Sequence, residues 1–190
     1  GTAFGLVFGA GAGSPRKLMV SYGVYRDVER DDNDYQVILS FDTESWWETL
    51  ALPLCQDRLH QNGAVSVQRC FLYTGNTNWG VQNLEYDAHV GQWLAAVYPG
   101  KKDRFANYSM FVIDGAVAPV AGVHDAYGKE ILLLTLAGQS DFPHGSTGMY
   151  AVGDGRYYFS EAGRHSEHGQ YTNVTLWRAT GDPASPFERI

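Results

Sequence analysis

The stretch NLEYDAHVGQW, residues 83–93, has the pattern of two strands joined by a tight turn. Polar and apolar residues alternate around Leu84, as in a strand with one face packed on a core. Asp87 then opens a polar turn, which Gly91 closes before the large side chain of Trp93. An Asp side chain can accept backbone N–H bonds in such a turn, and glycine tolerates its backbone angles. The stretch therefore predicts a β-hairpin.

The same kind of phrase occurs more than once, which indicates an internal repeat. VILSFDTESWW, residues 37–47, also places an aromatic residue and an Asp before a turn. Two distant parts of the chain share the order strand, G-x-G turn, strand, long polar loop, strand. The matching segments are 5–11 with 149–155, 18–23 with 157–163, and 34–41 with 170–177. We infer a repeat of about 45 residues.

Four antiparallel strands in about 45 residues correspond to one blade of a β-propeller. The composition agrees, because 22 Gly, 12 Tyr and 9 Phe favour tight turns and pleated surfaces. We predict that residues 1–190 form a single all-β domain, propeller-like, with four-stranded antiparallel blades; a β-sandwich is the alternative. The first blade would hold strands near 3–9, 17–23, 34–42 and 46–52, and the second would lie within 66–100.

The turns that follow Phe41 and Tyr86 resemble the Asp-box of sialidase-like propellers and the turns of kelch-type repeats. The resemblance concerns an architecture, extends over most of the chain and implies no particular family function. It places Phe41, Tyr86 and Trp177 at equivalent, largely buried blade positions. One interpretation is that the chain is part of a longer propeller, completed by further residues or by self-association with a second copy.

Charge and composition exclude some functions. The formal net charge is −7, and the 14 basic residues are scattered, so nucleic acid is not an expected partner. The apolar runs are too short and too rich in Gly to span a bilayer, so no membrane partner is expected either. No secretory leader is visible, although we favour a secreted or cell-surface location. Cys55 and Cys70 are expected to be buried thiols, with a disulfide as the open alternative.

Three polar segments are expected to be loops on one face of the repeat: 24–34, 76–79 and 164–170. The first is rich in carboxylates, which suit Ca²⁺ as a possible cofactor, and its candidate metal ligands are Asp31, Asp32 and Asp34. The alternative is a solvated acidic loop held by its own arginines. For acid–base chemistry on a sugar, the candidate catalytic carboxylates are Asp32, Asp34, Glu85 and Glu161.

The other two loops offer candidate ligand-binding side chains. Trp79 beside Asn76 and Asn78 provides an apolar face and amides, which a sugar ring requires. His165 and His168 provide imidazoles that could hold a ligand, and Arg30 adds a cation in the first loop. The alternative is that Trp79 packs between blades and that the histidines are free in solvent.

The sequence contains no GxSxG elbow, HExxH motif or P-loop, so it identifies no reaction, and whether the protein is an enzyme stays open. Two classes of function remain. The first is a module that binds or processes carbohydrate on its loop face, with a glycan as the partner. The second is a non-catalytic protein-interaction or structural module.

Overall fold

The computed structural model describes residues 1–23, 26–44, 46, 66–182 and 184–190. The regular structure of these residues is β-strand, which confirms the all-β prediction. The strands are β1 (Thr2–Gly5), β2 (Lys17–Gly23), β3 (Tyr35–Phe41), β4 (Gln68–Tyr73), β5 (Thr77–Asp87), β6 (Gln92–Pro99), β7 (Met110–Asp114), β8 (Val120–His124), β9 (Lys129–Leu133), β10 (Leu136–Ser140), β11 (Gly148–Ala151), β12 (Arg156–His165), β13 (Gly169–Ala179) and β14 (Phe187–Arg189).

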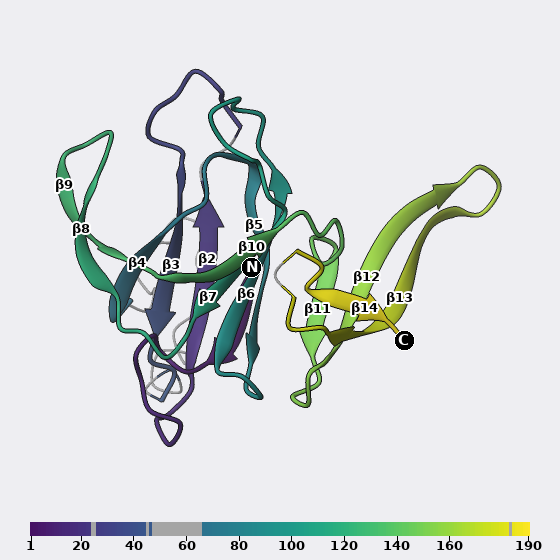
Figure 1. Ribbon diagram of the computed structural model, residues 1–190, viewed down its shortest axis with the longest axis horizontal. Coiled ribbons are helices and arrows are strands. Elements are labelled where there is room, and N and C mark those ends of the chain that lie inside the picture. The colour runs from purple at the N-terminus through teal and green to yellow at the C-terminus, as the bar shows by residue number, and fades with distance from the viewer. Residues whose placement is uncertain (24–25, 45, 47–65, 183) are drawn as a thin grey trace.

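The strands form three sheets, and no sheet closes on itself within the described residues (Figure 1). Sheet A has the order β1-β2-β3-β4-β9-β8, sheet B the order β10-β7-β6-β5, and sheet C the order β11-β12-β13-β14. Paired strands are antiparallel except for β4 and β9, which run parallel. Sheets B and C are thus four-stranded and antiparallel, whereas the β8–β9 hairpin extends sheet A.

The internal repeat corresponds to equivalent strand orders in sheets A and C. In each sheet three consecutive strands pair as antiparallel neighbours, β1–β3 in sheet A and β11–β13 in sheet C. The expected second unit, within 66–100, is wrong as a single sheet, because β4 pairs with β3 whereas β5 pairs with β6. Cys70 and Leu72 of β4 are buried on the same face as Ile38 of β3, so β4 continues sheet A.

Sheets A and B pack face to face around a first hydrophobic cluster, and sheets B and C share a second. The first cluster joins Met19 and Leu72 of sheet A to Trp93 and Phe111 of sheet B, among others. The second contains Leu94, Ala96, Met110, Phe142, Ala151, Tyr157, Phe159 and Phe187. Because alternate residues of β6 belong to different clusters, sheet B is buried on both faces.

Strand β5 and its hairpin to β6 hold the layers together. Leu84 points into the first cluster, and Trp93 is fully buried there with its indole Nε1 donating to the Leu6 carbonyl at 3.1 Å. The predicted turn is confirmed, because the carboxylate of Asp87 accepts the backbone N–H of His89 at 2.8 Å, and Gly91 has φ of 70°.

The alternate residues of β5 make hydrogen bonds toward sheet C. Asn83 donates to the carbonyls of Gly145 and Ser146 at 2.7 and 2.9 Å. Glu85 accepts the backbone N–H of Ala151 at 3.0 Å, and Asp87, which is fully buried, accepts the Tyr157 hydroxyl. Burial raises the pKa of Glu85, and the nearby Asp87 carboxylate adds to this effect.

The sequence repeat places Phe41, Tyr86 and Trp177 at equivalent positions. All three side chains are half-buried, which is less burial than expected. Tyr86 packs on the first cluster, where its ring centroid is 5.0 Å from that of Trp93. Trp177 packs on the second cluster, 5.3 Å from Phe142. Phe41 ends β3, and the strand expected at 46–52 falls almost entirely outside the described residues. Tyr86 and Trp177 therefore each border a core without lying inside it.

We expect Trp93→Ala to lower the free energy of unfolding by about 3–5 kcal/mol, since it empties the centre of the first cluster. Trp93→Phe should cost less, because it keeps most of the packing and loses the bond to the Leu6 carbonyl. Chemical denaturation measures both variants. If both variants lost the same small amount of unfolding free energy, the central position of the Trp93 ring would be contradicted.

Glu85→Gln should alter the pH dependence of stability, because the amide oxygen can still accept the Ala151 N–H but carries no charge. The pKa of Glu85 in the folded protein lies above its ordinary value of 4.5, so its ionised form disfavours folding and the penalty disappears as pH falls. The advantage of the variant over the wild type should therefore be larger at pH 7 than at pH 4.5. Urea titrations at the two pH values measure the difference in unfolding free energy between variant and wild type. A difference that does not change with pH would contradict a raised pKa of Glu85.

Candidate functional site

Of the three predicted loops, the described part of 24–34 and segment 76–79 lie at one end of sheets A and B. The connection that contains residues 26–34 joins β2 and β3, and it lies beside segments 74–76 and 100–107 at the upper end of Figure 1. Loop 164–170 joins β12 and β13 as expected, but it forms the tip of a hairpin that projects away from this end. The three loops therefore do not surround a single depression.

A buried ion pair anchors the acidic loop. Lys102 and Asp34, each with 5% of its side chain exposed, are joined by a bond of 2.7 Å between Nζ and Oδ1. The same ammonium donates to Asn33 Oδ1 at 2.7 Å and to the carbonyl of Arg30. Arg104 pairs with the second oxygen of Asp34. Lys102 is therefore structural, because the loop supplies three acceptors around its ammonium group.

The candidate calcium ligands of this loop are already engaged by cations. Asp32 pairs with Arg30 at 2.6 Å, Asp34 pairs with Lys102 and Arg104, and Asp31 lies 3.7 Å from Arg104. A calcium ion would have to displace a lysine or an arginine from these carboxylates. The loop is thus held by its own Arg30 and by two basic residues of segment 101–105.

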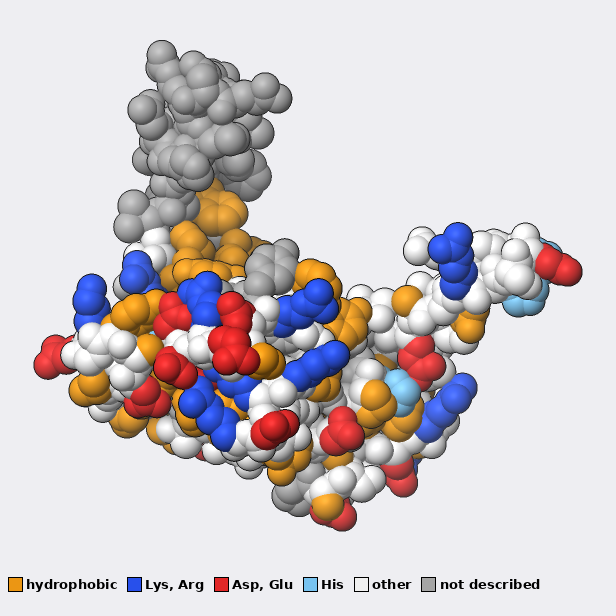
Figure 2. All heavy atoms as spheres, turned by 90° about the horizontal axis from the view of Figure 1, so that it is seen from above, with side chains coloured by type: hydrophobic (Ala, Val, Ile, Leu, Met, Phe, Trp, Pro, Cys, Tyr) orange, Lys and Arg blue, Asp and Glu red, His pale blue; other side chains and the backbone are white. Residues whose placement is uncertain are grey.

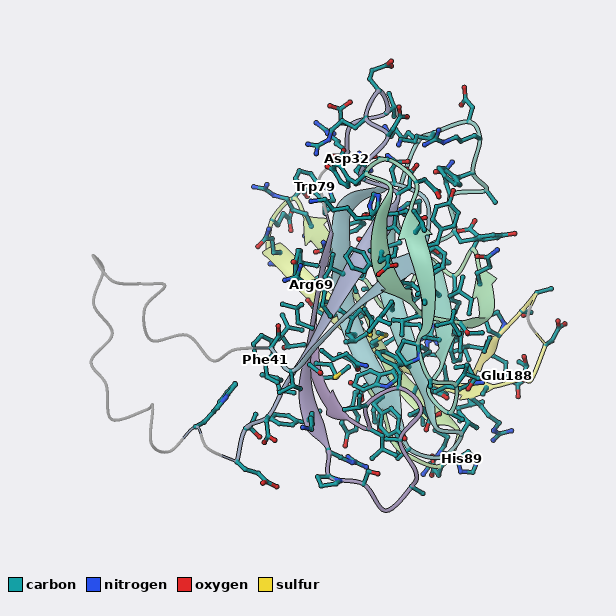
Figure 3. The ribbon with its side chains drawn as sticks, turned by 90° about the vertical axis from the view of Figure 1, so that its left-hand side faces the viewer. Asp32, Phe41, Arg69, Trp79, His89 and Glu188 are labelled. Carbon is teal, nitrogen blue, oxygen red and sulfur yellow. The ribbon has the colours of Figure 1, made fainter. Side chains whose placement is uncertain are left out.

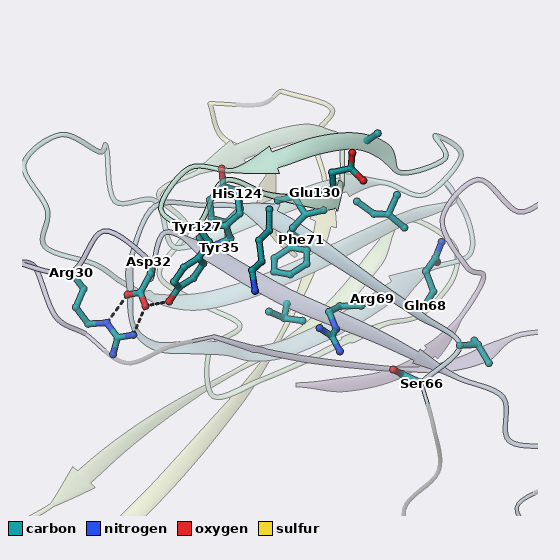
Figure 4. Close-up of a pocket in the computed structure, with 16 residues that line it drawn as sticks. Arg30, Asp32, Tyr35, Ser66, Gln68, Arg69, Phe71, His124, Tyr127 and Glu130 are labelled. Carbon is teal, nitrogen blue, oxygen red and sulfur yellow. Dashed lines mark hydrogen bonds and ion pairs between the residues drawn. The ribbon is translucent and has the colours of Figure 1, made fainter.

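A cavity of about 760 Å³ lies between the outer face of β3 and β4 and the β8–β9 hairpin (Figure 4). Strand alternation explains its position. Ile38 and Cys70 point into the first cluster, so their neighbours Val37, Arg69 and Phe71 point to the opposite face of sheet A. The β8–β9 hairpin, which pairs with β4 through β9, walls this face and creates the hollow.

Aromatic rings form one wall of the cavity. The imidazole of His124, at the end of β8, lies 4.5 Å from the ring of Tyr35, 4.9 Å from Tyr127 and 6.1 Å from Phe71, centroid to centroid. His124 is 5% exposed, and its Nδ1 has no hydrogen-bond partner among the described residues. Gln68 also lines the cavity, and its Oε1 is likewise buried without a described partner. A ligand hydroxyl could bond to either atom.

Charged residues line the rest of the cavity. Arg30 and Asp32 form a bidentate pair, and the Tyr127 hydroxyl also donates to Asp32. Arg69 and Lys129 line the cavity without an ion-pair partner in the described part of the chain. Figure 4 shows the Arg30–Asp32–Tyr127 contacts at one side of the cavity and Arg69 nearer its middle.

The titratable groups of this wall are held in defined states. Hydrogen bonds from Arg30, and then from Tyr127, lower the pKa of Asp32, so this carboxylate stays ionised. Burial, together with the Asp125 carboxylate, raises the pKa of Tyr35 to about 12. The hydrogen bond to Asp32 raises the pKa of Tyr127. Both phenols therefore remain protonated donors at neutral pH.

The predicted ligand residues Asn76, Asn78 and Trp79 lie near the same end of the molecule but outside this cavity. Segment 76–79 is not a loop, because β5 begins at Thr77 and continues through a register irregularity. Trp79 is 49% exposed, and the Arg26 guanidinium lies 5.6 Å from its ring centroid. Figure 3 shows Trp79 and Asp32 toward one end of the molecule and His89 at the opposite end.

The remaining candidates lie elsewhere. Glu85 is at the boundary between sheets B and C, and Glu161 of β12 lies 2.5 Å from His144. The structure therefore brings neither of them to the cavity that Asp32 lines, and Asp34 is held by Lys102 rather than lining the cavity. His165 and His168 stack at the hairpin tip, 4.7 Å apart. The possible ligand atoms of His165, Glu167 and His168 lie within 4.8 Å of one another at this exposed tip, and His165 Nδ1 accepts the Glu167 N–H at 3.2 Å.

The thiol of Cys70 is buried and free, as expected, and burial raises its pKa to about 11. Cys55 lies outside the described residues. Among the described residues, no helix has the length and apolar character to cross a membrane. We found no match to the chain among protein-family models, curated proteins or solved structures.

Sequence reasoning missed the aromatic wall, which includes Tyr35, Phe71, His124 and Tyr127. These residues come from segments far apart in the chain, so no local motif marks them. The sequence did contain one signal. In the strand QRCFLY, residues 68–73, both faces carry large side chains. Such a strand indicates that its second face is covered as well.

The neighbouring residues Lys101 and Lys102 allow a matched test of the buried pair. We expect Lys102→Ala to lower the free energy of unfolding by about 3 kcal/mol or more, because it leaves Asp34 and Asn33 buried without their shared donor. Lys101→Ala, at an exposed position, should change it by about 0.5 kcal/mol or less. Denaturant titration compares the two, and similar losses would contradict the anchoring role of Lys102.

Proposed function

We propose that this chain is a carbohydrate-binding module of the β-propeller type, which holds a sugar in the cavity beside the β8–β9 hairpin. The observation that carries the proposal is the aromatic wall of Tyr35, Phe71, His124 and Tyr127 next to polar side chains in a hollow of about 760 Å³. Sugar rings pack their C–H faces on aromatic rings, while their hydroxyls require donors and acceptors.

The polar groups of the cavity suit hydroxyls. His124 Nδ1 and Gln68 Oε1 are buried without described partners, and a bound hydroxyl would relieve the cost of leaving them unpaired. Arg69 and Lys129 supply donors that form no ion pair among the described residues, although the carboxylate of Glu130 also lines the cavity. A sugar that contacts both the aromatic wall and these polar side chains would thus be held by stacking and by hydrogen bonds.

Binding is favoured over hydrolysis by the states of the carboxylates. A glycosidase needs one carboxylic acid with a raised pKa beside an ionised one. Asp32 lines the cavity but its pKa is lowered, whereas Glu85, whose pKa is raised, bonds to Ala151 at the edge of sheet C. These two groups belong to different parts of the fold.

The propeller type is supported by two features of the sheets. Strands β1–β3 and β11–β13 repeat one order, as successive blades do. Sheet B is buried on both faces by sheets A and C, as a blade between two neighbours would be. In a β-sandwich, by contrast, each of the two sheets has one face in solvent.

A second candidate function, a protein-interaction or structural module, is favoured by the outer face of sheet C. Tyr150, Tyr158 and Val174 are 60%, 43% and 63% exposed, and the register pairs Tyr150 with Tyr158 on neighbouring strands. Exposed aromatic groups of this kind often mark interaction surfaces. A second copy of the chain or another protein could cover them.

Tyr127→Ala tests the carbohydrate proposal, with Tyr150→Ala as the matched control because the two tyrosines are 58% and 60% exposed. We expect the wild type and Tyr150→Ala to bind the same sugars on a glycan array and Tyr127→Ala to lose that binding. The loss of stability should be about 1 kcal/mol or less in both variants, as measured by denaturation.

Absence of glycan binding by the wild type would contradict the proposal. Loss of oligomerisation or of partner binding in Tyr150→Ala would instead support the interaction module. Equal loss of glycan binding in both variants would show that the cavity is not the binding site.

A further inference from the structure

A smaller hollow of about 250 Å³ lies apart from the large cavity and is lined by Arg26, Val28, Asn76, Asn78 and Lys101. Two of its five lining residues are cations, and none is a carboxylate, although the chain has a net charge of −7. Figure 2, which views the loop end from above, shows lysine and arginine side chains among the carboxylates of this face. The hollow thus has a local charge opposite to that of the whole chain.

Asn76 gives the hollow a donor without a partner. Its side chain is almost fully buried, with 2% of the residue exposed, and its Oδ1 accepts the backbone N–H of Lys102 at 3.4 Å. Its Nδ2 is buried and has no acceptor among the described residues. Because an unpaired buried donor is costly, a ligand oxygen at this point would be bound with little competition from the protein.

The two cations are also available to a ligand. Arg26 and Lys101 are exposed, and neither has an ion-pair partner in the described ranges. The Arg26 guanidinium lies near the ring of Trp79, which restricts where it can move. The carboxylates of Glu29 and Asp103 line an adjoining hollow rather than this one.

Asn78 adds an acceptor to this set of donors. Its Oδ1 is buried and has no hydrogen-bond partner among the described residues. An anion with no hydroxyl group would leave this oxygen unpaired and would be repelled by it. A ligand that carries a hydroxyl close to its anionic group would satisfy Asn78 and the three donors together.

We propose that this hollow binds a carboxylate with a neighbouring hydroxyl, the chemistry of a hydroxy acid or of a sugar acid. Arg26 and Lys101 pair with the carboxylate, Asn76 Nδ2 donates to one of its oxygens, and Asn78 Oδ1 accepts the hydroxyl. The proposal is independent of carbohydrate binding in the large cavity, because the two sets of lining residues do not overlap.

Titration of the ¹⁵N-labelled protein with glycolate, D-glucuronate, D-glucose and sulfate tests the site, with the side-chain NH₂ signal of Asn76 as the readout. We expect this signal to shift with glucuronate and not with glucose, which lacks the carboxylate. Sulfate, which has no hydroxyl, should bind about tenfold more weakly or worse. Glycolate binding as tight as that of glucuronate identifies a hydroxy acid site, and tighter glucuronate binding identifies a sugar acid site.

Arg26→Gln and Lys101→Gln should each weaken binding of the better acid about tenfold, because charge-assisted bonds are lost. Arg164→Gln, which removes an exposed cation from the distant hairpin, is the matched control and should bind as the wild type does. Tyr127→Ala, in the large cavity, should also keep the acid site. No shift of the Asn76 signal with either acid, or an equal loss in Arg164→Gln, would overturn the proposal, and sulfate binding as tight as that of the acids would overturn the role of Asn78.

Discussion

The alternation of strand β5 is the constraint on which the three-layer arrangement depends. One set of its side chains, including Leu84, enters the core between sheets A and B. The other set forms hydrogen bonds on the opposite side, Glu85 and Asp87 to sheet C and Asn83 to the segment just before it. A shift in the register of this strand by one residue would exchange the two sets and bury three polar side chains in the apolar core. The pattern therefore fixes which neighbour each face of sheet B receives.

The position of the large cavity follows from the same layering. The inner face of sheet A packs on sheet B. The opposite face of β3 and β4 is covered by the β8–β9 hairpin, and the cavity lies between them. At the end of the sheets, the buried pair of Lys102 and Asp34 ties the 26–34 loop to the segment after β6. That pair holds Arg30 and Asp32 at the edge of the cavity. A packing constraint in the core thus sets the geometry of the candidate site.

The sequence allowed prediction of the features that depend on neighbouring residues. The Asp87 turn and the strands on either side of it follow from local alternation and from the backbone freedom of Gly91. The antiparallel pairing of β1–β3 and of β11–β13 agrees with the two matched segments of the sequence. The separation of β4 from β5 was not predictable, because the partner of β4 is decided by contacts with β3 and β9. For the same reason, the aromatic wall around His124 and the burial of Lys102 could not be predicted from short motifs.

The distribution of carboxylates explains how an acidic chain can hold cationic hollows. Many of its aspartates have a structural role, since each accepts the N–H of a backbone residue two positions later. These aspartates are Asp27, Asp42, Asp87, Asp114, Asp154 and Asp182. Asp32 and Asp34 are engaged by basic side chains. Arg26, Lys101, Arg69 and Lys129 are left without ion-pair partners in the described residues, and all four line hollows. The acidic net charge is therefore compatible with cationic hollows, because many of the carboxylates are used in turns and in ion pairs.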